Sequence, residues 1–253
     1  MLRTPMTAMT RLLPVAKRTT RAAFLRAGVD IRRAGMPGKP VTDAEYRQAM
    51  MRHNQIDVVL DVGANTGQYA TRLRAGGYEG RIVSFEPLSS AFAVLSRHVA
   101  KDAAWSAHNV ALGADSSESV IHVSQDSISS SILPMVEWHS SSAPDSAYVG
   151  QERVKVATLD EITTLTDMDR AMLKIDTQGY EHLVVAGAQR TLTKILLIEC
   201  ELSLVPLYSG QYLLGEMITV FSASGFRPAG FDREFSDSHT GYAFQVNGFF
   251  CRA

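Results

Sequence analysis

Apolar runs alternate with helix-forming stretches along most of the chain, and polar or glycine residues separate them. Mostly apolar runs predict buried strands at residues 56–62, 81–87, 106–113, 171–176 and 195–202. Apolar positions at helical spacing predict helices at residues 43–50, 67–75, 89–100, 180–192 and 212–224. Strands that alternate with helices favour a mainly parallel sheet covered by helices on both faces.

Two pairs of segments interrupt this alternation. Residues 119–125 and 153–159 alternate strictly between apolar and polar positions, which predicts an inserted hairpin or two edge strands. Residues 226–231 and 247–253, joined by the polar loop 232–242, predict an antiparallel hairpin at one edge of the sheet. A dinucleotide-binding dehydrogenase would continue with strand–helix repeats, whereas a class I methyltransferase ends in an antiparallel strand.

The run VVLDVGANTGQYA, residues 58–70, places glycines directly after a buried strand. Gly63 and Gly67 permit positive φ and close approach of a ligand, and N–H groups at the next helix start point into the same space. Asn65 and Thr66 depart from the G-x-G-x-x-G spacing that lets a pyrophosphate approach. A ligand with an amino acid and an adenosine but no phosphates therefore fits better, and S-adenosylmethionine is such a ligand. An ordinary tight turn is the alternative.

Acidic residues mark the predicted carboxyl ends of several strands. Asp61 can accept from an ammonium group, and Glu86, which ends the second strand, suits the two hydroxyls of a ribose. Asp176 ends a later buried strand on the same rim of the sheet as Asp61, where an acid needs a partner. Glu199 and Glu201 share one face of the next strand.

Asp176 and one of these two glutamates are expected to form a carboxylate cluster. Glu199 is the better candidate because it lies deeper in its apolar run. The cluster would accept a proton or supply oxygen ligands to Mg²⁺, and salt bridges at the rim are the alternative. Glu181 and His182 open the following helix beside the site, where an acid also stabilises the helix dipole. Residues 129–133 predict a substrate or cofactor loop, or else an exposed linker.

These segments together resemble the FkbM family of S-adenosylmethionine-dependent O-methyltransferases. The matching segments are DVGANTGQYA, SFEP, NVALG, SSSIL and LKIDTQGYEHLVVAGA, in the expected order, within residues 50–250. The resemblance implies an α/β, Rossmann-like class I methyltransferase fold. Its mainly parallel seven-stranded sheet would carry the antiparallel C-terminal hairpin and the inserted hairpin. We expect a basic helical extension at residues 1–44 and a methyltransferase domain at residues 45–253.

The resemblance also assigns roles to the residues of the site. It implies that the glycine turn holds the methionine part of the cofactor, Glu86 its ribose, and the segment after the third strand its adenine. The cofactor-binding residues would be Asp61, Gly63, Asn65, Thr66, Gly67, Tyr69, Glu86, Pro87, Asn109, Ala111 and Leu112. The catalytic candidates are Asp176, Glu199, Glu181 and His182, and a Mg²⁺ ion held by Asp176 and Glu199 is the competing account.

Members of the family commonly methylate hydroxyls of sugars, glycolipids and polyketides, which implies a small-molecule or glycolipid acceptor here. A nitrogen or carboxylate acceptor on the same fold is an alternative. Two other classes stay open on the residues alone: an NAD-dependent dehydrogenase, and a non-catalytic module that binds S-adenosylmethionine. Neither the oligomeric state nor metal dependence follows from the resemblance.

Composition and charge narrow the setting. A chain of 253 residues, 45% of them hydrophobic, suits one α/β domain with an extension. The net charge of -1 favours no nucleic-acid partner, but residues 1–40 carry nine Lys or Arg and one Asp, a net +8 that leaves −9 elsewhere. We expect this segment to be a solvated or packed helical extension, a peripheral membrane contact or a targeting peptide.

The two cysteines, Cys200 and Cys251, provide neither a disulfide framework nor the spacing of a zinc site. A cytoplasmic setting is therefore expected, with membrane association if the basic segment binds lipid. No window approaches the roughly 20 apolar residues of a membrane span.

Overall fold

The computed structural model describes residues 43–237 and 240–253. The chain separates into two units, residues 1–46 and 47–253. The predicted basic extension, residues 1–44, lies outside the described residues except for its last two positions. Of the helices that are described, none is long and apolar enough to cross a membrane.

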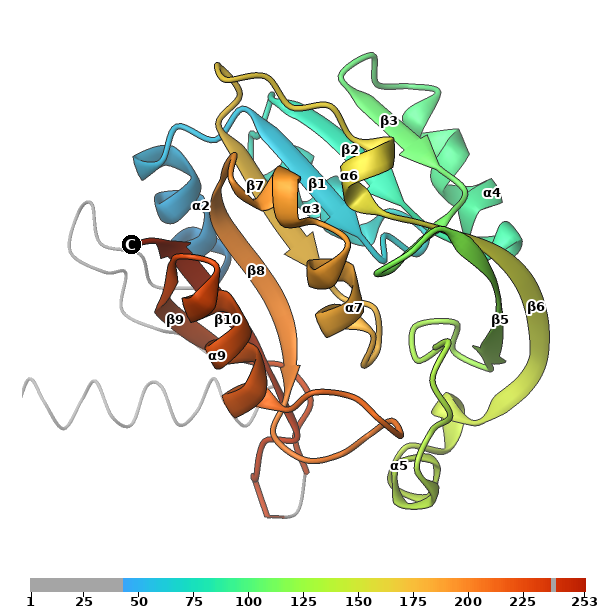
Figure 1. Ribbon diagram of the computed structural model, residues 1–253. Coiled ribbons are helices and arrows are strands. Elements are labelled where there is room, and N and C mark those ends of the chain that lie inside the picture. The colour runs from blue at the N-terminus through green and yellow to red at the C-terminus, as the bar shows by residue number, and fades with distance from the viewer. Residues whose placement is uncertain (1–42, 238–239) are drawn as a thin grey trace, which may run out of the picture. The chain divides into compact units, whose positions relative to one another are not determined.

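The second unit is built on a sheet that has seven strands in the described residues (Figure 1). In chain order these are β1 (Val58–Val62), β2 (Arg81–Phe85), β3 (Trp105–His108), β7 (Ala171–Ile175), β8 (Ile195–Ser203), β9 (Phe226–Arg233) and β10 (Gln245–Arg252). They lie side by side in the order β3-β2-β1-β7-β8-β10-β9. The pairs that β10 forms with β8 and β9 are antiparallel, and all the others are parallel. This order is that of the class I methyltransferase fold, so the predicted fold class is confirmed.

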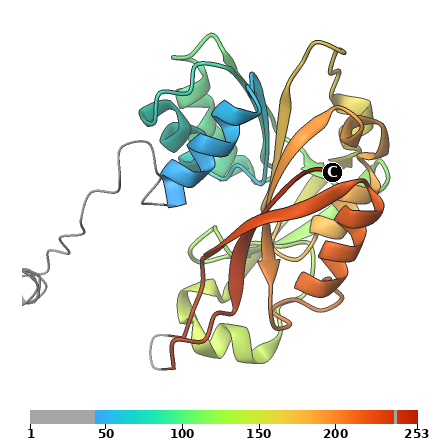
Figure 2. The ribbon, with the colours of Figure 1, turned by 90° about the vertical axis from the view of Figure 1, so that its left-hand side faces the viewer.

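Helices cover both faces of this sheet (Figure 2). One face packs against α3 (Gln68–Ala75), α4 (Ser89–Val99) and Met51 of α2 (Asp43–His53). The opposite face packs against α6 (Leu159–Ile162), α7 (Glu181–Ala186), α8 (Gln189–Leu192) and α9 (Leu214–Ala223).

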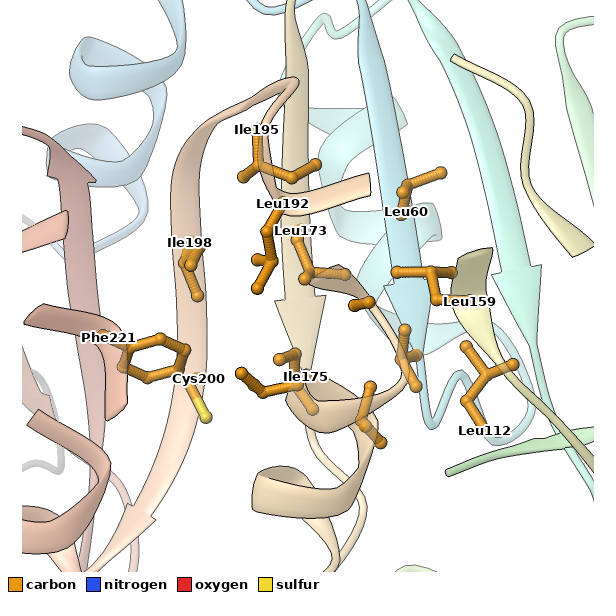
Figure 3. Packing of buried hydrophobic residues seen from close by; sticks show 14 of the residues in the cluster. Leu60, Leu112, Leu159, Leu173, Ile175, Leu192, Ile195, Ile198, Cys200 and Phe221 are labelled. Atoms are coloured by element: carbon orange, nitrogen blue, oxygen red, sulfur yellow. The ribbon is translucent and has the colours of Figure 1, made fainter. Parts of the chain in front are cut away.

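Alternation along the strands divides the core between the two faces. Leu60 and Leu173 pack on the face that α7 and α9 cover, in one cluster with Phe221 (Figure 3). Val59, the neighbour of Leu60, packs on the other face with Leu73 of α3. Because both faces are covered, every residue of β1 and β7 is buried, which explains their nearly continuous apolar runs.

One predicted strand, residues 106–113, is in fact two. β3 stays in the main sheet, whereas β4 (Ala111–Leu112) pairs in parallel with β6 (Tyr148–Ala157) in a second, smaller sheet. The chain leaves the main sheet at Asn109, whose side-chain amide donates to the backbone carbonyls of Glu86 and Pro87, each at 2.9 Å. The predicted inserted hairpin is confirmed, because β5 (Ser117–Ser124) pairs with β6 in antiparallel.

The predicted helix at residues 180–192 is also divided, into α7 and α8. The break falls at Gly187, where an added Cβ would lie only 2.0 Å from the carbonyl oxygen of Gly113. The segment that follows β4 therefore passes so close to this turn that only glycine fits there.

Candidate active site

In the described part of the chain, two neighbouring cavities open near the carboxyl ends of β1, β7 and β8. The serine-side cavity lies beside the β2 end and is lined by residues that include Glu86, Pro87, Ala111, Leu112, Ser127, Ser130 and Ile132. The charged cavity has a volume of about 420 Å³ and is lined by residues that include Arg47, Tyr69, Arg72, Lys174, Glu199, Glu201 and Glu234. Both cavities are also lined by Gly63, Asn65, Ile128 and Asp176. They therefore meet where the turns after β1 and β7 lie together.

The glycine turn after β1 is shaped by this close meeting. Gly63 has φ +74°, and an added Cβ would lie 1.7 Å from the carbonyl oxygen of Asp176. Asn65 has φ +47° and its side-chain amide donates to the backbone and hydroxyl oxygens of Ser127, both at 3.2 Å. Gly67 instead faces the core, where an added Cβ would lie 3.0 Å from Trp105. Of the two glycines, Gly63 alone lines the cavities.

Glu86 lies in the serine-side cavity as predicted. Its two carboxylate oxygens accept from the backbone N–H groups of Asn65 and Leu88, each at 2.8 Å. Burial raises the pKa of Glu86 to about 7, although those two N–H groups favour the charged form. Pro87, Ala111 and Leu112 line the same cavity, whereas Thr66 and Asn109 line neither.

Asp61 lies inside the sheet, fully buried, and not on its rim. Lys174, its partner in the parallel register of β1 and β7, places its ammonium group 3.3 Å from the Asp61 carboxylate. Asp61 lines neither cavity, so the ammonium that it meets is the protein's own and not that of a ligand. The predicted direct contact with the cofactor is corrected by this position.

Lys174 joins the two turns and was not singled out from the sequence. Its ammonium group donates to the carbonyl oxygen of Gly63 at 3.0 Å and lies 3.5 Å from the Asp176 carboxylate. Burial lowers the pKa of Lys174, but the carboxylates of Asp176 and Asp61 outweigh it, and the pKa is raised. A lysine inside an otherwise apolar strand was the signal that the sequence offered.

Asp176 lies at the junction of the cavities, with 31% of its side chain exposed. The side-chain amide of Gln178 donates to Asp176 and also to Glu201, each at 2.8 Å. Burial raises the pKa of Glu201, and the neighbouring Asp176 carboxylate raises it further. The partner of Asp176 in the carboxylate cluster is therefore Glu201, and the preference for Glu199 was wrong.

Glu199 lines the charged cavity but is already paired. Arg47 donates to both of its oxygens, from Nε at 2.7 Å and from Nη2 at 2.6 Å, and the Tyr69 hydroxyl donates at 2.6 Å. This geometry matches the salt bridge that was the alternative for Glu199. Within the described residues no group of three or more acid, histidine or cysteine side chains is arranged to hold a metal ion. A Mg²⁺ site built on Asp176 and Glu199 thus has no support.

Glu181 and His182 line neither cavity. Glu181 is buried and accepts from the backbone N–H groups of Thr177 and Gly179, at 2.9 and 3.1 Å. His182 stacks on Tyr212 with ring centroids 4.2 Å apart, and burial lowers its pKa. In this structure Glu181 supports the start of α7 and His182 packs on Tyr212, and their catalytic role stays a prediction.

The serine-rich segment lies against the site. Ser127, Ile128, Ser130 and Ile132 line the serine-side cavity, and Ile128 also lines the charged one with 58% of its surface exposed. The Ser131 hydroxyl donates to the backbone carbonyl of Gln178 at 2.7 Å. This placement favours the substrate or cofactor loop over the linker.

Comparison with known proteins identifies the family to which this site belongs. The sequence matches the family described as "Methyltransferase FkbM domain" over residues 61–228. The chain belongs to the FkbM methyltransferase family. It is therefore a methyltransferase, and the dehydrogenase and non-catalytic alternatives are set aside.

No curated protein matches this FkbM methyltransferase. The magnesium protoporphyrin IX methyltransferase of Synechocystis PCC 6803, solved with bound S-adenosylmethionine, is 9% identical; the match covers 94% of this chain and 97% of that one, with a TM-score of 0.45. A putative RNA methyltransferase from Pyrococcus horikoshii is 10% identical over 94% of this chain and 99% of that one, with a TM-score of 0.47. Likenesses this distant transfer neither substrate nor site residues to this chain.

Proposed function

We propose that this FkbM methyltransferase transfers the methyl group of S-adenosylmethionine to a hydroxyl group, most simply one of a sugar in a glycolipid or related small molecule. The observation that carries the proposal is the pair of cavities that meet at Asp176. The serine-side cavity, about 80 Å³ in volume, presents the apolar and carboxylate groups that a nucleoside would contact, and the charged cavity, of about 420 Å³, is large enough for a polar acceptor.

The residues of the serine-side cavity fit S-adenosylmethionine better than a dinucleotide. Among the described residues that line this cavity there is no lysine, arginine or histidine, but there are two carboxylates, Glu86 and Asp176. The nearby Lys174 ammonium is already paired with Asp61 and Asp176. A pyrophosphate would therefore meet these carboxylates with no cation in the cavity lining to balance its charge, whereas the positive sulfonium is attracted by them. Glu86 would accept from the ribose hydroxyls, and Pro87, Ala111 and Leu112 would provide apolar surface for the adenine.

The protein must then orient the acceptor hydroxyl toward the methyl group and remove the proton of that hydroxyl. The bound cofactor supplies an activated methyl group. The chain must hold the acceptor oxygen in line with it, and effective molarities of about 10⁵–10⁸ M show how much such positioning contributes. An aliphatic hydroxyl is a poor nucleophile, so we assign Asp176 to accept its proton during attack, a step that adds roughly 10²–10⁴-fold.

The proposal also covers the class of acceptor and the place in the cell where the enzyme would meet it. Hydroxyl-rich sugars suit a cavity whose walls carry Arg72, Glu201, Glu234 and Asn247. A glycolipid acceptor would place the enzyme at the cytoplasmic side of a membrane, with the basic segment 1–40 against anionic lipid. That segment lies outside the described residues, so this contact stays a prediction.

The test is transfer of an isotopically labelled methyl group from S-adenosylmethionine to a panel of methyl glycosides and extracted glycolipids. We expect an O-methylated product, identified by mass spectrometry, and binding of S-adenosylhomocysteine but not of NADH. Asp176→Asn should keep S-adenosylhomocysteine affinity within a few-fold and lower transfer at least roughly 100-fold. EDTA should leave the wild-type rate unchanged.

Three results would count against the proposal. Methylation of nitrogen or carboxylate acceptors alone would move the enzyme to another acceptor class. Near-full turnover by Asp176→Asn would make this residue a structural acid only. If EDTA abolishes turnover and added Mg²⁺ restores it, Asp176 and Glu199 would act as ligands of a Mg²⁺ ion.

A further inference from the structure

Gln178, in the turn between β7 and α7, joins Asp176 and Glu201, two of the carboxylates that line the charged cavity. Its Nε2 atom lies 2.8 Å from an oxygen of Asp176 and 2.8 Å from an oxygen of Glu201. An amide nitrogen carries two N–H groups, so one group can serve each carboxylate. The two residues come from different strands, and this side chain bridges them.

The two carboxylates set the orientation of the Gln178 amide, and Tyr208 contacts its oxygen end. The Tyr208 hydroxyl lies 2.8 Å from Gln178 Oε1 and 3.1 Å from the carbonyl oxygen of Ser129. Burial raises the pKa of Tyr208, so the hydroxyl keeps its proton and donates it. Because carboxylates only accept, the nitrogen end of the amide must face Asp176 and Glu201.

The backbone of Gln178 is held in an unfavourable conformation. Its φ of +55° lies in the left-handed region, which is uncommon for a residue other than glycine. The Ser131 hydroxyl fixes its carbonyl at 2.7 Å, and at Gly179 an added Cβ would lie 3.0 Å from the side chain of Tyr208. Strain that the surroundings hold in place, beside a ligand cavity, is a reason to look for a function.

We propose that Gln178 is a positioning residue that keeps Asp176 and Glu201 together as a pair and holds the Asp176 carboxylate where the two cavities meet. The inference rests on the proposed function, because the charge of Asp176 matters there only if the sulfonium lies at the same place. Gln178 also lines the serine-side cavity, and its proposed role is exerted through Asp176.

Loss of the Gln178 amide should change the charge at the junction. Charged groups near the pair in the described part of the chain include Lys174, 3.5 Å from Asp176, and Asp61, which interacts with Asp176. Glu181 and Glu234 raise the pKa of Glu201 further. Without two shared N–H donors, the facing carboxylates repel each other, and one takes up a proton at a higher pH than in the wild type. The negative charge available to a sulfonium then falls at neutral pH and returns as pH rises.

The experiment compares two ligands that differ in charge. S-adenosylmethionine carries a positive sulfonium and S-adenosylhomocysteine a neutral thioether, so the ratio of their affinities, measured by calorimetry from pH 6 to 9, reports the negative charge at the junction. In Gln178→Met we expect the preference for S-adenosylmethionine to fall roughly tenfold at neutral pH and to recover at high pH. Gln178→Asn should show a smaller change in the same direction, because its shorter amide cannot reach both carboxylates.

Gln245→Met is the matched control. Gln245 donates to the same Glu201 carboxylate, at 2.7 Å, and no hydrogen bond joins it to Asp176 in the described part of the chain, so the affinity ratio should stay within about twofold. If Gln178→Met does not fold, Gln178→Asn decides, since asparagine tolerates the left-handed backbone.

The outcomes separate this inference from the proposed function. An unchanged ratio in the Gln178 variants, or equal weakening of both ligands, overturns the inference and leaves the function standing. Failure of the wild type to bind either ligand overturns the function and the inference together.

Discussion

Glu86 is a single residue whose surroundings change its chemistry. The ionised carboxylate accepts from the ribose hydroxyls more strongly than the neutral acid does, and burial raises the pKa of Glu86 to about 7. We expect wild-type affinity for S-adenosylhomocysteine to rise between pH 6 and 8. Glu86→Gln should weaken binding by about 1.5–3 kcal/mol at pH 8 and remove most of this pH dependence. Calorimetry that finds equal affinities in a folded variant would remove Glu86 from the ribose.

The same pKa makes a prediction for stability. A carboxyl whose pKa is raised on folding contributes stability below its unfolded value, and that contribution is lost as pH rises through about 7. The free energy of unfolding of Glu86→Gln, measured by urea denaturation, should therefore rise relative to that of the wild type as the pH is raised from 4.5 to 8. An unchanged difference across this range would contradict the raised pKa.

Gly63 and Gly77 form a natural comparison at the residue scale. Both have positive φ, of +74° and +86°, but an added Cβ meets the Asp176 carbonyl oxygen at Gly63 and open space at Gly77. Gly77→Ala should cost about 1–2 kcal/mol, the backbone term alone. Gly63→Ala should cost more than about 3 kcal/mol in urea denaturation, because the two turns must also separate. Equal costs would show that the close approach is not required.

Residues with a purely local pattern were predictable from the sequence. Gly63 follows an apolar strand, and Glu86 ends the next one, so their place in the site followed from position alone. Lys174 and Gln178 were not predicted, because their partners lie on other strands and only the register and the turns bring them together. Glu199 was misjudged for the same reason, since its partner Arg47 lies 152 residues away in the chain.

At the scale of elements, an ion pair between Arg47 of α2 and Glu199 of β8 is expected to stabilise the fold. Arg47 and Glu199 form an ion pair whose side chains are 16% and 4% exposed. Arg47→Met should lower the free energy of unfolding by about 3–5 kcal/mol, because it leaves a buried carboxylate unpaired. The double variant with Glu199→Gln should lose less than the sum of the two single variants, as measured by a double-mutant cycle. Additive losses would mean that the pair does not interact.

Glu199 also has a test for a catalytic role. If Glu199→Gln loses methyl transfer but keeps its stability, Glu199 takes part in the reaction.

Elements with a clear apolar period were predicted, and irregular ones were not. The chain after β3 alternates poorly and turns away at Asn109, so one strand was expected where the structure has two. Helix α5 (Glu137–Ser142) has the sequence EWHSSS, which carries no helical period, and no helix was predicted there. Its helix depends on tertiary packing, such as that of Trp138 against Phe244, with ring centroids 5.2 Å apart.

At the scale of the whole molecule, strand order and cavity chemistry agree. The antiparallel ending at the β9 edge was visible in the sequence, and the order β3-β2-β1-β7-β8-β10-β9 places the ends of β1 and β7 side by side. Because these ends are adjacent, the serine-side cavity and the charged cavity lie next to each other. The described residues that line the first include no cationic side chain, whereas Arg47, Arg72 and Lys174 line the second. No local pattern could divide the site in this way, because the division depends on the fold.

The most direct measurement of the central claim is a crystal structure of the protein with S-adenosylhomocysteine bound. We expect the ribose hydroxyls within about 2.6–3.2 Å of the Glu86 carboxylate, the adenine beside Ala111 and Leu112, and the sulfur near Gly63 and Asp176. The charged cavity would then remain open for the acceptor. A nucleoside bound in the charged cavity against Arg47 and Glu199, with the serine-side cavity empty, would contradict this account of the site.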